Sequence, residues 1–199
     1  MSVSNKDWIG DTNSVFKCLG SSHHTDHDRE THDYYATDPV AMELLLKEEE
    51  LRNVWECACG EGHLCRVLDA HGVLGRSSDI VDRGYGETAD FLSPGITSWD
   101  GDIATNPPYK YALEFCRKGL DIVSEGRKVC MFLRLQFLEG KSRKGFFMKH
   151  PPHTVYVASS RIRCAINGDF KPKASSAVAY AWFVWRKGYT GETHVKWIN

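Results

Sequence analysis

The sequence predicts an α/β fold in which a mostly parallel, doubly wound sheet is covered by helices on both faces. Short apolar runs alternate with stretches of helical periodicity, and this alternation is typical of strands joined by crossover helices. A glycine turn, in the stretch WECACGEGHL, stands where an early apolar run passes into a helical stretch. We therefore expect a ligand site beyond the carboxyl ends of the strands, where that turn lies.

The expected elements follow one another from residue 37 onward. Thr37 or Asp38 is a suitable cap for a first helix, and Pro39 suits its first turn. Gly72 closes the next helix. We expect helices over residues 37–50, 61–72 and 111–126, strands over residues 52–60, 75–81, 101–106, 128–137, 153–159 and 175–188, and a basic helix or loop over residues 141–152.

A chain of 199 residues is long enough for one domain with a substantial core. We expect a polar segment over residues 1–32 and a single domain over residues 33–199, without a separate large domain for target recognition. The hydrophobic fraction of 42% and the charged fraction of 26% are ordinary for a globular protein. No apolar stretch approaches the length of a membrane span, and the first residues lack the pattern of a secretory signal.

The cysteines and histidines favour neither disulfides nor a metal site. Seven cysteines are an odd number, and Cys57, Cys59 and Cys65 fall in or beside the glycine turn, so reduced thiols in a cytoplasmic protein are expected. Four histidines stand among acidic residues near the N-terminus with a spacing that fits no standard zinc site: His23, His24, His27 and His32.

The net charge of -1 conceals an uneven distribution along the chain. Residues 1–109 hold 8 Lys and Arg against 20 Asp and Glu, whereas residues 110–199 hold 17 against 6. Because phosphate contacts dominate affinity for nucleic acids, the second half could supply a basic face for a polyanion. The alternative is that the two kinds of charge do not separate in space.

The glycine turn carries the features of a cofactor site. Gly60 and Gly62 permit a tight turn and the close approach of a ligand, and the helix that follows offers free N–H groups. Asp79 ends the next strand, where an acid can bind ribose hydroxyls. Glu56 would repel a pyrophosphate, so the set suits S-adenosylmethionine, which carries a sulfonium, an amino group and a ribose. A plain tight turn and a capping role for Asp79 are the alternatives.

Two further stretches extend this pattern. Asp90 and Phe91 follow a third expected strand and could hold the cofactor's adenine through a hydrogen bond and a ring contact, although core packing of Phe91 is equally consistent. The sequence TNPPY follows the strand at residues 101–106. Together, ECACGEG, ADF and TNPPY resemble the class I, Rossmann-like S-adenosylmethionine-dependent methyltransferases that methylate amino groups.

The resemblance covers residues 33–169. Its motif order is similar to that of the gamma group of DNA adenine methyltransferases, particularly short phage-type enzymes, which act in the cytoplasm of a bacterial or phage-infected cell. The stretch HDYYATDP resembles their upstream cofactor motif, which implies that Tyr35 and Thr37 contact the methionine part of the cofactor. Cys57 and Ala58 would belong to the loop around it, although Cys57 replaces a proline that is common in the family.

The NPPY sequence is the family's signature for the adenine N6 amine. The resemblance implies that the side-chain oxygen of Asn106 and the backbone carbonyl of Pro107 accept hydrogen bonds from this amine, which favours the charge that develops during methyl transfer. Pro107 and Pro108 restrict the backbone, so that these acceptors stay in place. Tyr109 would stack on a base rotated out of the duplex. A proline-stiffened surface turn is the alternative.

The basic residues of the second half are candidate DNA contacts, and a loop at residues 167–173 could also reach the substrate. The candidates are Lys110, Lys141, Arg143, Lys144, Lys149, Arg161 and Arg163. With no separate recognition domain, we expect a short or degenerate target sequence, or a contribution from a second copy in a homodimer. Three alternatives stay open: methylation of an RNA adenine, methylation of a glutamine amide in a release factor, and a catalytically silent nucleic-acid-binding protein.

Overall fold

The computed structural model describes residues 35–166 and 178–199. In chain order, the elements are β1 (Tyr35–Thr37), α2 (Val40–Glu48), β2 (Val54–Glu56), α3 (His63–Ala70), β3 (Leu74–Asp79), β4 (Glu87–Thr88), β5 (Ile103–Thr105), η1 (Tyr109–Tyr111), α4 (Ala112–Ile122), β6 (Lys128–Arg134), η2 (Leu135–Leu138), α5 (Lys144–Lys149), β7 (Thr154–Ala158), β8 (Cys164–Ile166), β9 (Tyr180–Arg186) and β10 (His194–Ile198). The polar segment 1–32, with its histidines, and the loop 167–173 lie outside the described residues.

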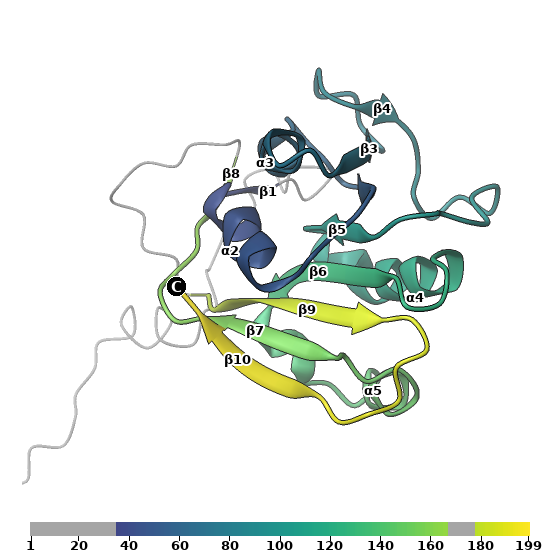
Figure 1. Cartoon of the computed structure of the whole chain (residues 1–199), viewed down its shortest axis with the longest axis vertical. Helices are drawn as coiled ribbons and strands as arrows, with labels where there is room; N and C mark the ends of the chain where they lie inside the picture. Colours follow the sequence, from purple (N-terminus) through teal and green to yellow (C-terminus); the bar gives the residue numbers. More distant parts are fainter. Residues whose placement is uncertain (1–34, 167–177) are drawn as a thin grey trace, which may run out of the picture.

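One eight-stranded sheet forms the centre of the domain, in the order β10-β7-β9-β6-β5-β2-β3-β4 (Figure 1). Among these described strands only β9 is antiparallel to its neighbours, β6 and β7. The sequence-based prediction of a mostly parallel, doubly wound sheet is therefore confirmed. Within the same described parts of the chain, no helix is long and apolar enough to cross a membrane.

Hydrophobic side chains cover both faces of the sheet, which explains why its central strands are continuous apolar runs. Along β6, Val129, Met131 and Leu133 face one hydrophobic cluster, whereas Cys130 and Phe132 face another. The first cluster includes residues of α4 and α5, and the second includes residues of α2 and α3. Each face of the sheet is therefore closed by its own pair of helices.

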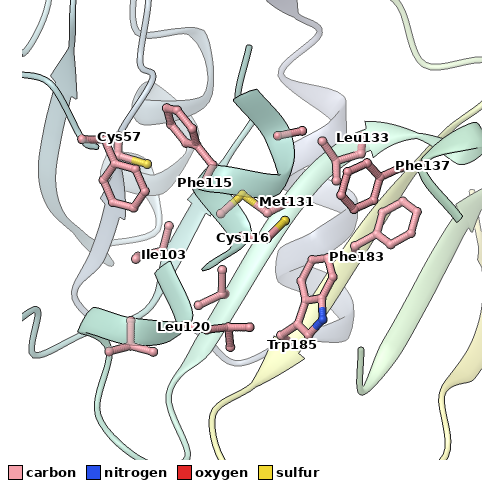
Figure 2. Close-up of a cluster of buried hydrophobic side chains, with 14 of the residues drawn as sticks. Cys57, Ile103, Phe115, Cys116, Leu120, Met131, Leu133, Phe137, Phe183 and Trp185 are labelled. Atoms are coloured by element: carbon pink, nitrogen blue, oxygen red, sulfur yellow. The ribbon is translucent and has the colours of Figure 1, made fainter. Parts of the chain in front are cut away.

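The first of these clusters shows how the α4 face is packed. Phe115 and Cys116 of α4 lie beside Met131 of β6, and the rings of Phe183 and Trp185 of β9 extend the cluster (Figure 2). All five side chains are buried. Burying a large apolar side chain contributes about 1.5–3 kcal/mol, so this layer fixes the orientation of α4, which begins just after the NPPY sequence.

Four strands were not foreseen or were misjudged in extent. A separate pair, β1 and β8, is antiparallel and joins residues that are far apart in the sequence. Strand β4 spans only two exposed residues, and β10 adds a parallel edge strand beside β7. Such short or exposed strands lack the apolar run that identifies a buried strand, so no local pattern marks them.

The order of the strands places the two expected ligand-binding sequences side by side. Strand β2 pairs in parallel with β5 through Trp55 and Ile103, and the sheet grows in opposite directions from this pair. The turn at residues 57–62 leaves the carboxyl end of β2, and residues 106–109 leave the carboxyl end of β5. This reversal of strand order is where doubly wound folds bind ligands.

The same order separates the two halves of the chain. Strands β2 to β5 lie on one side of the sheet, and the later strands β6, β7, β9 and β10 lie on the other. The described strands of the first half of the chain therefore lie at one end of the sheet and those of the second half at the other, whereas α2 packs over second-half strands β6, β7 and β9.

Asp102 fixes the other end of the central strands. Its buried carboxylate accepts the backbone N–H of Arg52 at 2.7 Å and that of Lys128 at 2.7 Å. These residues precede β2 and begin β6, so one side chain aligns the starts of both neighbours of β5. Its backbone carbonyl also accepts the N–H of Trp55 at 2.9 Å.

Replacing Asp102 by alanine should lower the free energy of unfolding by about 3 kcal/mol, because two hydrogen bonds to a carboxylate are lost in a buried place. Urea denaturation measures this difference. Asp100→Ala is the matched control: its side chain is 90% exposed and pairs with Arg127 at 3.3 Å, so the loss should stay below about 1 kcal/mol. Equal losses in the two variants would contradict the alignment role of Asp102.

Candidate active site

The turn after β2 is built around two glycines with left-handed backbone. Gly60 has φ 53°, and Gly62 has φ 80° and precedes the first residue of α3. The turn is anchored by the N–H of Cys59, which donates to the carbonyl of Ser78 at 2.9 Å, and by the N–H of Gly62, which donates to the carbonyl of Cys59 at 2.8 Å. Residues with a Cβ adopt this backbone only with strain, so the glycines are a structural requirement here.

Asp79 ties the end of β3 to this turn. Its carboxylate accepts the N–H of Gly60 at 2.8 Å and that of Val81 at 3.0 Å, and only 8% of the residue is exposed. The capping role that sequence reasoning offered as an alternative is thus observed. Each oxygen retains a second lone pair, so binding of ribose hydroxyls stays a prediction that this geometry permits.

Glu56 is a buried acid at the end of β2. Burial raises its pKa to about 8, and the charge of the nearby Asp79 acts in the same direction. The Thr105 hydroxyl and the N–H of Ala58, which donates to Oε1 at 3.1 Å, favour the carboxylate and oppose this rise. At neutral pH the carboxyl group is therefore mostly protonated, unless a cation approaches it.

Asn106 emerges from β5 next to the glycine turn. Its side-chain nitrogen donates to the hydroxyl of Thr37 at 2.7 Å, so the upstream motif and the NPPY sequence touch directly. Pro107 is buried, and Pro108 has φ -57° and leads into the short helix η1. The two prolines hold Asn106 at the end of the strand while the chain turns away.

Neighbouring side chains contact both the hydroxyl and the ring of Tyr109, so the ring is less exposed than one that is open to stacking by a base. Its hydroxyl donates to the hydroxyl of Tyr180 at 3.1 Å, and the guanidinium of Arg134 lies 4.5 Å from the centre of its ring. Burial is the main cause that raises the pKa of this phenol well above its usual range. A cavity of about 150 Å³ opens beside the ring and is lined by Tyr109, Ala112, Leu133, Arg134, Gln136, Phe137 and Arg143.

The residues predicted to hold an adenine and the methionine part of a cofactor have mixed environments. Phe91 is 1% exposed, and the centre of its ring lies 5.3 Å from that of Trp55 and 4.9 Å from that of Phe115. Its packing in the core is therefore observed. Asp90 is exposed, and its carboxylate accepts the N–H of Leu92 at 2.9 Å. Contacts of Asp90 and Phe91 with an adenine stay predictions.

The other predicted loop residues differ in exposure. Cys57 is buried, and burial is the main cause that raises the pKa of its thiol. Ala58 is half-buried beside it. Tyr35 begins β1, where its backbone pairs with Ile166. Cys57 and Ala58 belong to the turn after β2, and the contacts of all three residues with a cofactor stay predictions.

The basic residues fall into separate groups. Lys110 follows the NPPY sequence, and Arg161 and Arg163 follow the carboxyl end of β7, so these three lie at the same edge of the sheet as the glycine turn. Arg163 forms an ion pair with Asp38 at 3.7 Å. Lys149 ends α5, which Figure 1 shows beside the start of β7, toward the opposite edge, so it does not join this group.

Of the remaining three candidates, Lys141 and Arg143 lie between η2 and α5, and Lys144 is the first residue of α5. Lys141 and Lys144 are exposed. The guanidinium of Arg143 instead donates to the carbonyls of Phe137, at 2.9 Å, and of Glu139. Arg143 therefore caps η2, in addition to any role it has toward DNA.

Sequence reasoning missed two side chains at this site. The ring of Tyr85 covers Gly62 so closely that an added Cβ would stand 2.5 Å from it, and the guanidinium of Arg66 lies 5.3 Å from its centre. Arg134 covers Tyr109, as described above. Tyr85 stands between two glycines in the sequence GYG after β3, and this pattern could have indicated a role in the turn. Nothing in the sequence near Arg134 indicates its contact with Tyr109. Among the described residues there is no cluster of His, Cys, Asp and Glu that could hold a metal ion.

No protein-family model matches the sequence, and no curated protein is similar to it in sequence. Solved structures are similar in fold. A Listeria monocytogenes protein assigned to the class I S-adenosylmethionine-dependent methyltransferases matches with a TM-score of 0.52 and 12% identity, over 90% of this chain and 69% of that one. A structure of a type I restriction–modification system matches with a TM-score of 0.51 and 15% identity, over 94% of this chain and 48% of that one.

This chain has the Rossmann-like fold of the class I methyltransferases. The fold named by the resemblance in the sequence is therefore confirmed. The chain spans about half the length of the restriction–modification protein that it matches.

Gly62→Ala should destabilise the protein more than Gly72→Ala. Both glycines have positive φ, 80° and 67°, and a side chain at either costs about 1–2 kcal/mol of backbone strain. Nothing lies within 4 Å of a Cβ at Gly72, whereas at Gly62 the ring of Tyr85 must move, which adds about 1–3 kcal/mol. Urea denaturation measures the loss of stability in the two variants. When Gly62→Ala is made in a Tyr85→Ala background, its additional loss over Gly72→Ala should disappear. An equal cost at both positions would show that Tyr85 does not cover the turn.

The stability of the protein should fall as pH rises between about 4.5, the ordinary pKa of Glu56, and its folded-state value of about 8. In this range the folded protein keeps a proton that the unfolded chain has lost, so the free energy of unfolding decreases by up to about 1.4 kcal/mol per pH unit. Urea denaturation at pH 5.5 and 7.5 measures the slope. Glu56→Gln, which cannot titrate, should remove this contribution, and an unchanged slope in that variant would argue against a protonated Glu56.

Proposed function

We propose that this protein transfers a methyl group from S-adenosylmethionine to the exocyclic N6 amine of adenine in DNA. The observation that carries the proposal is the position of Asn106: it follows β5, directly beside the glycine turn of β2, at the reversal of strand order in a class I methyltransferase fold. A sequence that suits an aromatic amine and a turn that suits the cofactor thus share one edge of the sheet.

The side chains around the turn fit this cofactor chemically. Glu56 and Asp79 bring two carboxyl groups together, which suits a ligand with a cationic amino group and ribose hydroxyls. The raised pKa of Glu56 fits as well, because a bound cation would favour its ionised form. The cofactor would supply a methyl group activated by its sulfonium.

The protein's part in the reaction is to hold the amine, because the amine is itself the nucleophile. Asn106 and Pro107 would accept hydrogen bonds from N6. These bonds would make the lone pair of N6 more available to attack the methyl carbon. Formation of the bond from N6 to that carbon would be matched by cleavage of the bond from carbon to sulfur, whose electron pair would stay on sulfur. N6 then releases one proton to water. No nucleophilic side chain is needed.

The cavity beside Tyr109 supports a base as the substrate. Its volume of about 150 Å³ lies between aromatic rings and guanidinium groups, a lining that suits a flat base with an attached phosphate. Arg134 lies over the ring of Tyr109, so a base that stacks on this face takes the place of the guanidinium and leaves it available for a phosphate.

Three observations favour DNA over a protein substrate. The second half of the chain has 17 Lys and Arg against 6 Asp and Glu, and Lys110, Arg161 and Arg163 lie at the edge that carries the NPPY sequence. A phosphate-rich partner is the ligand that such charges attract. One of the structures with this fold belongs to a type I restriction–modification system.

Incubation with methyl-labelled S-adenosylmethionine and unmethylated DNA should place label on N6 of adenine, identified after digestion to nucleosides. Asn106→Ala removes one acceptor and should lower kcat by about 10²–10³-fold, with little change in cofactor affinity. The variant's thermal unfolding should be recorded as a control for folding.

The other outcomes decide between substrates. Label in RNA of the same sequence but not in DNA would transfer the proposal to RNA adenine, and label in a release factor alone would replace it by methylation of a glutamine amide. Binding of DNA without label in any substrate would leave a nucleic-acid-binding protein and overturn the enzymatic proposal.

A further inference from the structure

The small β1–β8 pair brings Thr37 to the edge of the sheet where Asn106 emerges. Thr37 pairs with Cys164 at the end of this two-stranded sheet and is 4% exposed. The next residue is held as well: the N–H of Asp38 donates to the carbonyl of Arg163 at 3.0 Å, and the two side chains form an ion pair at 3.7 Å. The position of the Thr37 hydroxyl is therefore set by backbone pairing on both sides.

This hydroxyl accepts the side-chain N–H of Asn106 at an Nδ2 to Oγ1 distance of 2.7 Å. A hydroxyl has one proton to donate and two lone pairs to accept with. Burial raises the pKa of the Cys164 thiol, and the nearby Thr37 hydroxyl acts against this rise. In this hydrogen bond a lone pair of Thr37 meets the amide, so the nitrogen of Asn106 lies on the Thr37 side.

We infer that Thr37 is a positioning residue for Asn106, whose hydroxyl holds the amide nitrogen so that the carbonyl oxygen faces the substrate amine. This inference rests on the proposed function and extends it. An amide turned by half a rotation would present N–H groups to N6, and two donors facing each other cannot form the hydrogen bond that the reaction needs. The upstream motif thus acts on the reacting amine through Asn106, in place of the cofactor contact that the sequence suggested for Thr37.

The test compares two replacements of Thr37, each of which changes one of the two groups on its Cβ. Thr37→Val keeps the branched shape but has no acceptor, so we expect kcat to fall about 10- to 100-fold, with the Kd for S-adenosylmethionine and the KM for DNA within about twofold of wild type. Thr37→Ser keeps the hydroxyl and should retain kcat within about threefold. A general loss of stability would not lower kcat while leaving both binding constants unchanged, and serine would not reverse it. The expected pattern therefore distinguishes positioning of Asn106 from destabilisation.

Thr154 offers a matched control. It is also a buried threonine, 1% exposed, and its hydroxyl lies 2.8 Å from a ring nitrogen of His153 at the opposite edge of the sheet. Thr154→Val should lower stability without changing kcat at a temperature where the variant is folded. A rise of tenfold or more in the Kd for S-adenosylmethionine in Thr37→Val, with kcat unchanged, would overturn the inference and restore the cofactor contact.

A second measurement does not depend on the reaction. In protein with ¹⁵N-labelled asparagine, the side-chain NH₂ signal of Asn106, assigned by its loss in Asn106→Ala, should show slowed exchange with water in wild type and Thr37→Ser, and fast exchange in Thr37→Val. Equal exchange in all three would contradict the inference. If wild type methylates no adenine, the proposed function fails, and this measurement still decides whether Thr37 holds the amide.

Discussion

The parallel pairing of Trp55 with Ile103 is the constraint on which the rest of the site depends. It sets the carboxyl ends of β2 and β5 level with each other, so that the glycine turn and Asn106 leave the sheet as neighbours. Trp55 makes this register rigid: it is fully buried, its indole N–H donates to the hydroxyl of Ser78 at 2.9 Å, and the guanidinium of Arg76 lies 4.2 Å from its ring. Because side chains alternate between the two faces of a strand, a slip by one residue would turn Glu56 and Thr105 to the wrong faces.

Buried polar groups gather at this edge, and each is held by an element that is distant in the sequence. Asp79 of β3 holds the turn after β2 through Gly60, and Thr37 of β1 holds Asn106 after β5. Unpaired polar groups are costly in the interior, so such contacts fix orientation and limit that cost together. The site is therefore a junction of β1, β2, β3 and β5, and a chemical role for any one of its side chains depends on the other strands being in place.

Long apolar strands and amphipathic helices were predictable because their side-chain periods are local properties of the chain. Strand β6 is the clearest case, with both faces buried and a continuous apolar sequence. Strand β10, which pattern reasoning missed, is mostly exposed, β4, which was expected before Asp90 without bounds, spans only two residues, and β1 and β8 are defined by each other. At the site, the glycines and the NPPY sequence are visible as motifs, whereas the cover of Tyr85 over Gly62 and of Arg134 over Tyr109 requires knowledge of which loops meet.

The sequence by itself determined the α/β class, the alternation of strands and helices, the glycine turn, and the residue types suited to a cationic cofactor and an aromatic amine. Those features are written in neighbouring residues, where period, turn chemistry and charge act over a few positions. Only the tertiary structure decided that Thr37 touches Asn106, that Phe91 is part of the core, that Arg143 caps η2 and that the strands of the two halves of the chain lie at opposite ends of the sheet. These outcomes depend on strand order and register, which arise from the packing of the whole chain and leave no mark on any single segment.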